Sequence, residues 1–277
     1  MKFKKVFILT VILICVVPIL AHEFWLQPQQ YLFGAGDEVN IRFKVGEGFS
    51  GENWKGNQER VQELKLYYAD VTDNLKTALS SDEGDSVQFS LFEEGTAMVT
   101  FNSLNSYLEL EAPKFNDYLV EDGLTSAIDY RREHNETDST SREFYQRSVK
   151  TIIQIGSRRT DIYKKQTSLP LDIIPLSNPY TLGNDQLLKV KVLFRGQPLS
   201  NAKMRIWHKL SEAVTDTSFL SDSNGEISFP VTVSGEWMVS CVNMIHLNDD
   251  PKAKWQSYWG SLTWGYTGKS STSSRSR

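Results

Sequence analysis

The sequence predicts an all-β fold of two β-sandwich, immunoglobulin-like domains, the first with a helical insertion. Apolar and polar residues alternate in short runs, most clearly from Val39 to Val45, where every second residue is apolar. Turn-forming glycine and aspartate residues separate such runs, as at 81–85 and 94–95. A length of 277 residues suits two domains of ordinary size better than one.

The first domain is predicted to span residues 22–172. Alternation places every second side chain on a buried face, so strands are expected at 39–45, 64–68, 87–91, 97–101 and 107–112. From about 115 to 150 the apolar residues recur at helical intervals instead, which predicts the helical insertion. Strand character returns at 151–155.

The second domain is predicted to span residues 173–266. The proline-rich segment 168–180 (SLPLDIIPLSNPY) indicates the connection to it. Short strands with turns between them are typical of an immunoglobulin-like sandwich, and they are expected at 188–194, 203–210, 226–231, 237–245 and 258–266. Residues 267–277 are low in apolar content and are predicted to form a disordered tail.

Residues 1–21 have the pattern of a cleaved signal peptide. A basic start is followed by the apolar run 6–20, which is shorter than the roughly 20 residues that cross a membrane, and then by Ala21. Ile19 is larger than the small residue usual at its position, so an uncleaved anchor stays an alternative. Cleavage makes His22 the first residue. The product is predicted to be periplasmic, with no integral membrane span after the signal.

Composition excludes several classes of protein. The formal charge is −4, from 34 acidic and 30 basic residues, whereas nucleic-acid binders usually carry a basic stripe. No nucleic-acid partner is therefore expected. Loss of the signal removes Cys15 and leaves Cys241 alone, so the folded chain must be held by its cores without an internal disulfide.

Two motifs resemble known sites and are interpreted otherwise. Residues 46–51 match the glycine pattern of dinucleotide-binding loops, but no helix-forming segment follows them, and the surroundings predict strands. A glycine-rich loop explains the pattern better. His22 and Glu23 begin like a zinc-protease motif, but Leu26 stands where its second histidine is needed.

His22 and His246 are the candidate metal ligands. After cleavage, His22 would offer an α-amine and an imidazole nitrogen, a pair that suits copper(II) or nickel(II). Met244 and His246 share one face of a predicted strand, so His246 could supply a third nitrogen. The competing interpretations are a solvated terminal histidine and a histidine that only ends its strand.

Aromatic residues gather near the end of the chain. Trp255, Ser257 and Trp259 alternate on one face of the last predicted strand, with Trp264 and Tyr266 nearby. Such a row could stack against a sugar, but it could equally fill the space between two sheets. Because aromatic side chains bury large areas in small sandwiches, the core interpretation is favoured.

Several segments taken together resemble a known family. They are His22-Glu-Phe-Trp-Leu26, Val45-Gly-Glu-Gly-Phe49, Tyr118-Leu with Asp122-Gly-Leu124, 142–150, 175–180, 194–199 and 257–263. In this order they resemble the periplasmic domain of unknown function 4198 family, whose members are often labelled by similarity to a substrate-specific component of nickel uptake. The resemblance implies β-sandwich modules and no established catalytic residues. Within it, His22 and His246 match a metal role.

The predicted function is therefore that of a non-enzymatic, periplasmic accessory protein in transition-metal uptake or homeostasis. Its cofactor would be a divalent transition metal, nickel, cobalt or copper, and its partner an envelope transport component or an outer-membrane receptor. Two alternatives stay open. One is a cell-envelope module that binds carbohydrate or protein through its tryptophans, and the other is a copper oxidase with a terminal-histidine site.

Overall fold

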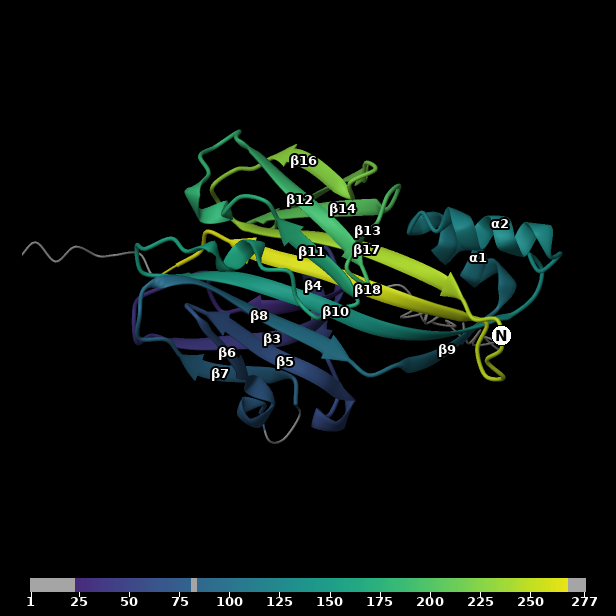
Figure 1. Ribbon diagram of the computed structural model, residues 1–277, viewed down its shortest axis with the longest axis horizontal. Helices are drawn as coiled ribbons and strands as arrows, with labels where there is room; N and C mark the ends of the chain where they lie inside the picture. Colours follow the sequence, from purple (N-terminus) through teal and green to yellow (C-terminus); the bar gives the residue numbers. More distant parts are fainter. Residues whose placement is uncertain (1–22, 81–83, 269–277) are drawn as a thin grey trace, which may run out of the picture.

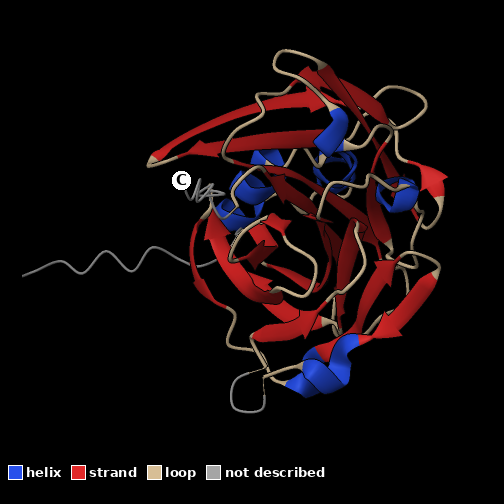
Figure 2. Cartoon of the chain, turned by 90° about the vertical axis from the view of Figure 1, so that its left-hand side faces the viewer, coloured by secondary structure: helices blue, strands red, loops and turns tan. Residues whose placement is uncertain are grey.

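β-Strands make up most of the molecule (Figures 1 and 2). The computed structural model describes residues 23–80 and 84–268. The predicted signal peptide, His22 and residues 269–277 of the predicted tail lie outside the described residues. The strands belong to three sheets that pack face to face, which confirms the predicted all-β sandwich.

The first sheet contains the beginning of the described chain. Its four strands are β1 (Glu23–Pro28), β3 (Glu38–Glu47), β4 (Ser50–Asn53) and β7 (Ser86–Ser90). The alternation predicted at residues 39–45 is confirmed in β3, where Val39, Ile41 and Phe43 are fully buried. Gly48 and Phe49 join β3 to β4, both at positive φ (56° and 61°), as a tight two-residue hairpin turn requires. The glycine-rich motif is therefore a turn that opens no helix.

A ten-stranded sheet runs through the centre of the molecule. Its main path is β15 (Ala213–Leu220), β14 (Lys203–Leu210), β17 (Glu236–His246), β18 (Trp255–Gly265), β10 (Ser141–Ile155), β8 (Gly95–Ser103), β5 (Val61–Tyr68) and β6 (Val71–Asn74). The short strands β2 (Leu32–Phe33) and β9 (Ser106–Leu110) also pair with β10. β10 and β18 are parallel, whereas β17 is antiparallel to β18.

The third sheet covers the other face of the C-terminal half. It contains β11 (Leu171–Pro175), β12 (Leu187–Phe194), β13 (Gln197–Pro198) and β16 (Glu226–Pro230). One core fills the space between this sheet and β14, β17 and β18, and a second core fills the space between the first sheet and β5, β8 and β10. The central sheet therefore contributes to both cores.

Two helices lie at one end of the long strands β17 and β18 (Figure 1). They are α1 (Ala112–Glu121) and α2 (Thr125–Glu133), and they pack against Val242, Met244 and Trp255. Within the described residues, short turns of 3-10 helix are found at η1 (Gln58–Arg60), η2 (Leu75–Ala78), η3 (Asp161–Lys164) and η4 (Pro179–Thr181).

The helical segment is shorter than the sequence predicts. Residues 141–150, assigned above to the insertion of about 115–150, instead form the first part of β10. Tyr145 and Val149 have helical spacing, but β10 is paired on one side with β9 and on the other with β18. Backbone pairing on both edges outweighs a local pattern of that kind.

The central sheet also bears on the predicted domain boundary. β10 lies in the predicted first domain and β18 in the second, and they pair over nine positions, from Glu143–Trp255 to Thr151–Thr263. Lys150 of β10 forms an ion pair with Asp172 of β11, and both side chains are buried. The division into residues 22–172 and 173–266 stays a prediction.

Candidate functional site

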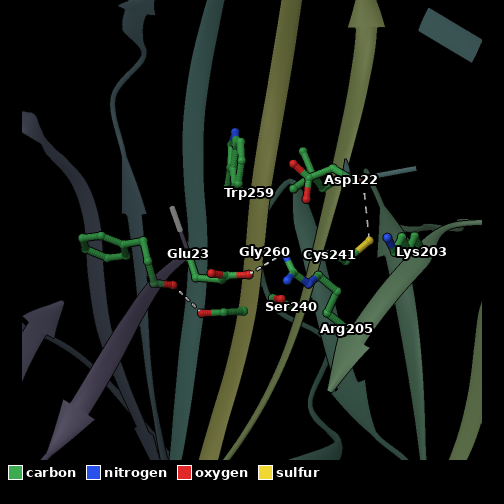
Figure 3. A pocket seen from close by; sticks show the side chains of 11 residues that line it. Glu23, Asp122, Lys203, Arg205, Ser240, Cys241, Trp259 and Gly260 are labelled. Atoms are coloured by element: carbon green, nitrogen blue, oxygen red, sulfur yellow. Dashed lines mark hydrogen bonds and ion pairs between the residues drawn. The ribbon is translucent and has the colours of Figure 1, made fainter. Parts of the chain in front are cut away.

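A small pocket lies where β1 begins, between the first sheet and the central sheet. We call it the N-terminal pocket. The space inside it is about 10 Å³, close to that of a single water molecule or ion. Its charged lining residues come from three separate parts of the chain, namely Glu23 of β1, Asp122 after α1, and Lys203 and Arg205 of β14, with Cys241 and Trp259 beside them (Figure 3).

Hydrogen bonds from β18 fix the start of β1 over the central sheet. The Ser261 hydroxyl donates to the Phe24 carbonyl at 2.7 Å, and the Thr263 hydroxyl donates to the Leu26 carbonyl at 2.9 Å. On its other side Glu23 pairs with Gly46 of β3. The Glu23 side chain is consequently held inside the molecule, with 5% of its surface exposed, and its carboxylate points at Arg205 (Figure 3).

Asp122 reaches the pocket from the end of α1. Its backbone N–H closes the helix by donating to the Tyr118 carbonyl, and Gly123 follows at φ 66°, the left-handed conformation common after a helix end. A Cβ on Gly123 would lie 2.9 Å from the Cβ of Lys203, so the helix end approaches β14 closely. This close approach buries the Asp122 side chain, which is 7% exposed.

The two buried carboxylates have free oxygen atoms. Glu23 Oε1 lies 3.5 Å from Arg205 Nη1, but Glu23 Oε2 and Asp122 Oδ2 have no hydrogen-bond partner among the described residues. Buried polar atoms are normally satisfied, so each free oxygen calls for an explanation. A bound cation or a nearby positive group would supply one.

Acidic groups outnumber basic groups around the pocket. Arg205 also lies 3.4 Å from Glu47 and 3.4 Å from Glu121, and Lys203 donates to the Glu121 carbonyl. Arg205 and Lys203 therefore face four carboxylates, from Glu23, Glu47, Glu121 and Asp122. When all of these groups are ionised, the cluster has an excess of two negative charges, which a divalent cation would balance.

Burial sets the protonation of these acids. It raises the pKa of Glu23 to about 7, although Arg205 opposes the shift. It likewise raises the pKa of Asp122 to about 7, and the charge of Glu23 adds to that effect. Glu143, deeper under α1, has its pKa raised to about 8 by burial, against a 3.0 Å hydrogen bond from the Ser257 hydroxyl. A cation in the N-terminal pocket would compete with the protons of Glu23 and Asp122.

His246, one of the two predicted metal ligands, lies outside the N-terminal pocket. It is the last residue of β17 and lies five residues after Cys241, which lines the pocket. At the usual rise of a strand, the two residues are about 16 Å apart. Its ring stacks on Tyr130 at 4.1 Å, and its Nδ1 lies 3.0 Å from Asn248 Oδ1. In this arrangement Nδ1 faces an acceptor, and Nε2 makes no hydrogen bond to the described residues.

No group of three or more His, Cys, Asp or Glu side chains is placed to hold a metal within residues 23–80 and 84–268. His22, the other predicted ligand, lies outside those ranges and directly precedes Glu23. Of the remaining histidines, His208 is half-buried and stacks on Trp237 at 4.0 Å. His134 stacks on Tyr130 at 3.9 Å.

The aromatic row is mainly core. Trp255 and Trp264 are 2% and 0% exposed, which confirms that both belong to the core. Trp264 packs between the central and third sheets, whereas Trp255 packs under α1 and α2. Trp259 is half-buried and stacks on Tyr118 with the ring centres 5.6 Å apart. This leaves no open row of indole faces on which a sugar could stack.

No local pattern marks Asp122 or Glu143 as a buried acid. In the sequence, the two residues belong only to the segments 118–124 and 142–150 that resemble the family. Their neighbours come from residues far away in the chain, so only the assembled fold could reveal them.

The fold and the pocket define a β-sandwich protein with a small charged site under the start of its first described strand. The chain belongs to the domain of unknown function family DUF4198, whose sequence profile matches residues 19–245. No curated protein sequence matches it. None of the helices in the described part of the chain is long and apolar enough to cross a membrane.

Two solved structures show weak similarity. The three N-terminal domains of the bacteriophage RB49 Highly Immunogenic Outer Capsid protein (Hoc) are 12% identical, with a TM-score of 0.20, and the match covers 87% of this chain and 59% of that one. A DUF3823 family protein from Bacteroides uniformis ATCC 8492 is 10% identical, with a TM-score of 0.22, over 89% of this chain and 100% of that one. This chain thus spans 59% of the phage structure. Neither similarity bears on function.

Proposed function

We propose that this chain is a periplasmic, non-catalytic accessory protein that binds a divalent transition metal, nickel or copper, for uptake or homeostasis. The observation that supports the proposal best is the pair of free buried oxygens, Glu23 Oε2 and Asp122 Oδ2, in the N-terminal pocket. Glu23 directly follows His22, the residue that signal cleavage would make the N-terminus. A metal held by His22 would thus be bound close to two carboxylates.

The donor set has the chemistry of a tetragonal site. The α-amine and imidazole of His22 supply two nitrogens, and the carboxylates of Glu23 and Asp122 can supply oxygens. Tetragonal sites of nitrogen and oxygen are typical of copper(II) and nickel(II). A divalent ion would also balance the two excess negative charges around Arg205.

His246 remains the proposed further nitrogen ligand, through its free Nε2. The strand register separates it from the N-terminal pocket by about 16 Å, so two arrangements are distinguishable. In one, His246 joins the ion at His22 after a local rearrangement. In the other, the carboxylates complete the site, and His246 only packs on Tyr130.

We also infer that residues 173–266 form an immunoglobulin-like module and that the two helices are an insertion into the first sandwich. The packing of β11, β12 and β16 against β14, β17 and β18 supports the first inference. The position of α1 and α2 between β9 and β10 supports the second.

Metal titrations of protein matured by export test the proposal. One added glycine before His22 displaces the α-amine while keeping every side chain, and it should weaken copper and nickel binding at least roughly tenfold. Asp122→Asn should weaken binding by a similar factor if a carboxylate is a ligand. His246→Ala should weaken it only if Nε2 coordinates. Isothermal calorimetry with each metal gives the affinities.

Glu133→Gln, on the exposed surface of α2, is the matched control and should bind as the parent does. Intact-mass analysis of the exported protein shows whether it starts at His22. Equal metal affinity of the parent and the glycine-extended form would overturn the proposal, as would a mature chain that does not begin at His22.

A further inference from the structure

A second hollow lies beside the glycine-rich hairpin of β3 and β4. We call it the hairpin groove. It has a volume of about 600 Å³ and is lined by residues 45–47 and 50–55 of the hairpin and by Tyr145 and Arg147 of β10. A neighbouring hollow of about 530 Å³ shares residues 52–55 with it and extends to Arg60. Both volumes are in the range of small-molecule sites.

Arg147 is a half-buried cation without a polar partner for its side chain. Its guanidinium lies over the ring of Phe24 at 4.8 Å and near the ring of Tyr145 at 5.4 Å. No carboxylate, carbonyl or hydroxyl of residues 23–80 or 84–268 binds the guanidinium. Arg205, in the N-terminal pocket, instead contacts three carboxylates. Because a desolvated cation is costly to leave unpaired, Arg147 calls for a negative partner.

The acidic side chains that line the groove already form ion pairs with basic residues. Glu52 forms an exposed ion pair with Lys55 at 3.9 Å, and Glu47 pairs with Arg205 at 3.4 Å. Arg60 lines the adjoining hollow, and its side chain also has no ion pair within the described ranges. Burial lowers the pKa of Arg147 to about 10, and the positive charge of Arg60 contributes to the lowering. Two uncompensated guanidinium groups therefore lie close to one opening.

The glycines of the motif keep the hairpin narrow beside this opening. A Cβ on Gly46 would lie 2.0 Å from the Ser50 carbonyl oxygen, and one on Gly51 would lie 2.2 Å from the Val45 carbonyl oxygen. The two strands can therefore approach only because these residues have no side chains. Gly56 lies equally close to the Trp54 ring, where a Cβ would come within 2.0 Å.

We propose that the hairpin groove binds a small organic anion, held through a carboxylate or phosphate group by Arg147 and Arg60. A guanidinium binds either group through two parallel hydrogen bonds. Tyr145 offers a half-buried ring against which the body of a sugar-like or aromatic ligand can pack. Glu47 and Glu52 at the rim would repel highly charged polyanions, so a ligand with one or two charges fits best. This site is separate from the proposed metal site and does not depend on it.

Four probes distinguish the sources of the anionic group. Glucuronate has a carboxylate attached to a sugar ring, and glucose 6-phosphate has a phosphate attached to a sugar ring. Inorganic phosphate tests the anion without a ring, and glucose tests the ring without a charge. NMR or calorimetric titration of the full chain should show binding of at least one of the two sugar anions and none of glucose. Binding should weaken as salt is added, since the contact is between charges.

Arg147→Gln should reduce the affinity at least tenfold, and Arg147→Lys should retain part of it. Arg60→Gln, which changes an exposed side chain and should leave the fold intact, should reduce it several-fold. Arg132→Gln, on α2 and paired with Asp129, is the matched control and should have no effect. Failure of every anion to bind at millimolar concentration would overturn the proposal. Equal affinity of the parent and both the Arg147→Gln and Arg60→Gln variants would also overturn it.

Discussion

Replacing Glu143 with glutamine is expected to raise the free energy of unfolding at pH 8 by about 4 kcal/mol. Burial raises the pKa of Glu143 to about 8, and its Oε2 has no hydrogen-bond partner within the described ranges. Glutamine has a similar shape and can still accept from the Ser257 hydroxyl, but it has no charge to desolvate. Urea unfolding at several pH values measures the difference.

The gain should be almost lost at pH 4, because the carboxyl group is then mostly protonated in both the folded and the unfolded chain. Glu133→Gln, on the exposed face of α2, is the control and should change stability little at any pH. A gain from Glu143→Gln that is the same at pH 4 and pH 8 would show that charge is not its cause.

Three of the buried acids, Glu23, Asp122 and Glu143, also make the free energy of unfolding depend on pH. The unfolded chain loses their protons near pH 4, whereas folded Glu23 and Asp122 hold theirs to about pH 7 and Glu143 to about pH 8. Folding therefore takes up protons between these limits, and stability decreases as the pH rises from about 5 to about 8. A metal bound by Glu23 and Asp122 would remove the contribution of these two acids to the loss of stability between pH 5 and pH 8.

Replacing Lys150 with methionine should destabilise the protein by about 3–5 kcal/mol. The substitution removes one partner of the buried ion pair between β10 and β11 and leaves the Asp172 carboxylate without its cation. Among its contacts with described residues, Asp172 would then keep only the 2.8 Å hydrogen bond from the Thr167 N–H to Oδ2. Denaturant unfolding at pH 7 gives the change in free energy.

The double variant Lys150→Met with Asp172→Asn tests whether the unpaired charge is the cause. Asparagine can still accept from the Thr167 N–H and has no charge, so the double variant should recover most of the lost stability. Destabilisation by Lys150→Met that Asp172→Asn does not relieve would show that lost packing of the lysine stem dominates.

Local patterns predicted the strands better than the helices. Val39, Ile41 and Phe43 alternate, and the structure confirms a strand there because a half-buried strand needs only that pattern. The segment 141–150 has helical spacing at Tyr145 and Val149 but forms part of β10. Its pairing partners include Trp255 to Leu262, more than 100 residues later, and no local pattern can reveal them.

The candidate site was only partly predictable for the same reason. His22 follows from the signal-peptide pattern, and the place of Glu23 beside it follows from the sequence. Asp122, Arg205 and Cys241 have no local sign of a shared site. They meet because α1 ends against β14 and because β17 and β18 lie under β1, which are contacts between distant parts of the chain.

The position of β18 has a consequence for how the protein folds. The ribosome makes this strand after the other strands of the described residues, yet it lies between β17 and β10 in the centre of the largest sheet. Before Gly265 is made, both neighbours have an open edge, and the two halves of the sheet cannot join. Such long-range pairing gives a high contact order and slow folding. Chains that end before Trp255 would expose the unpaired edges of β17 and β10 and would be prone to aggregate.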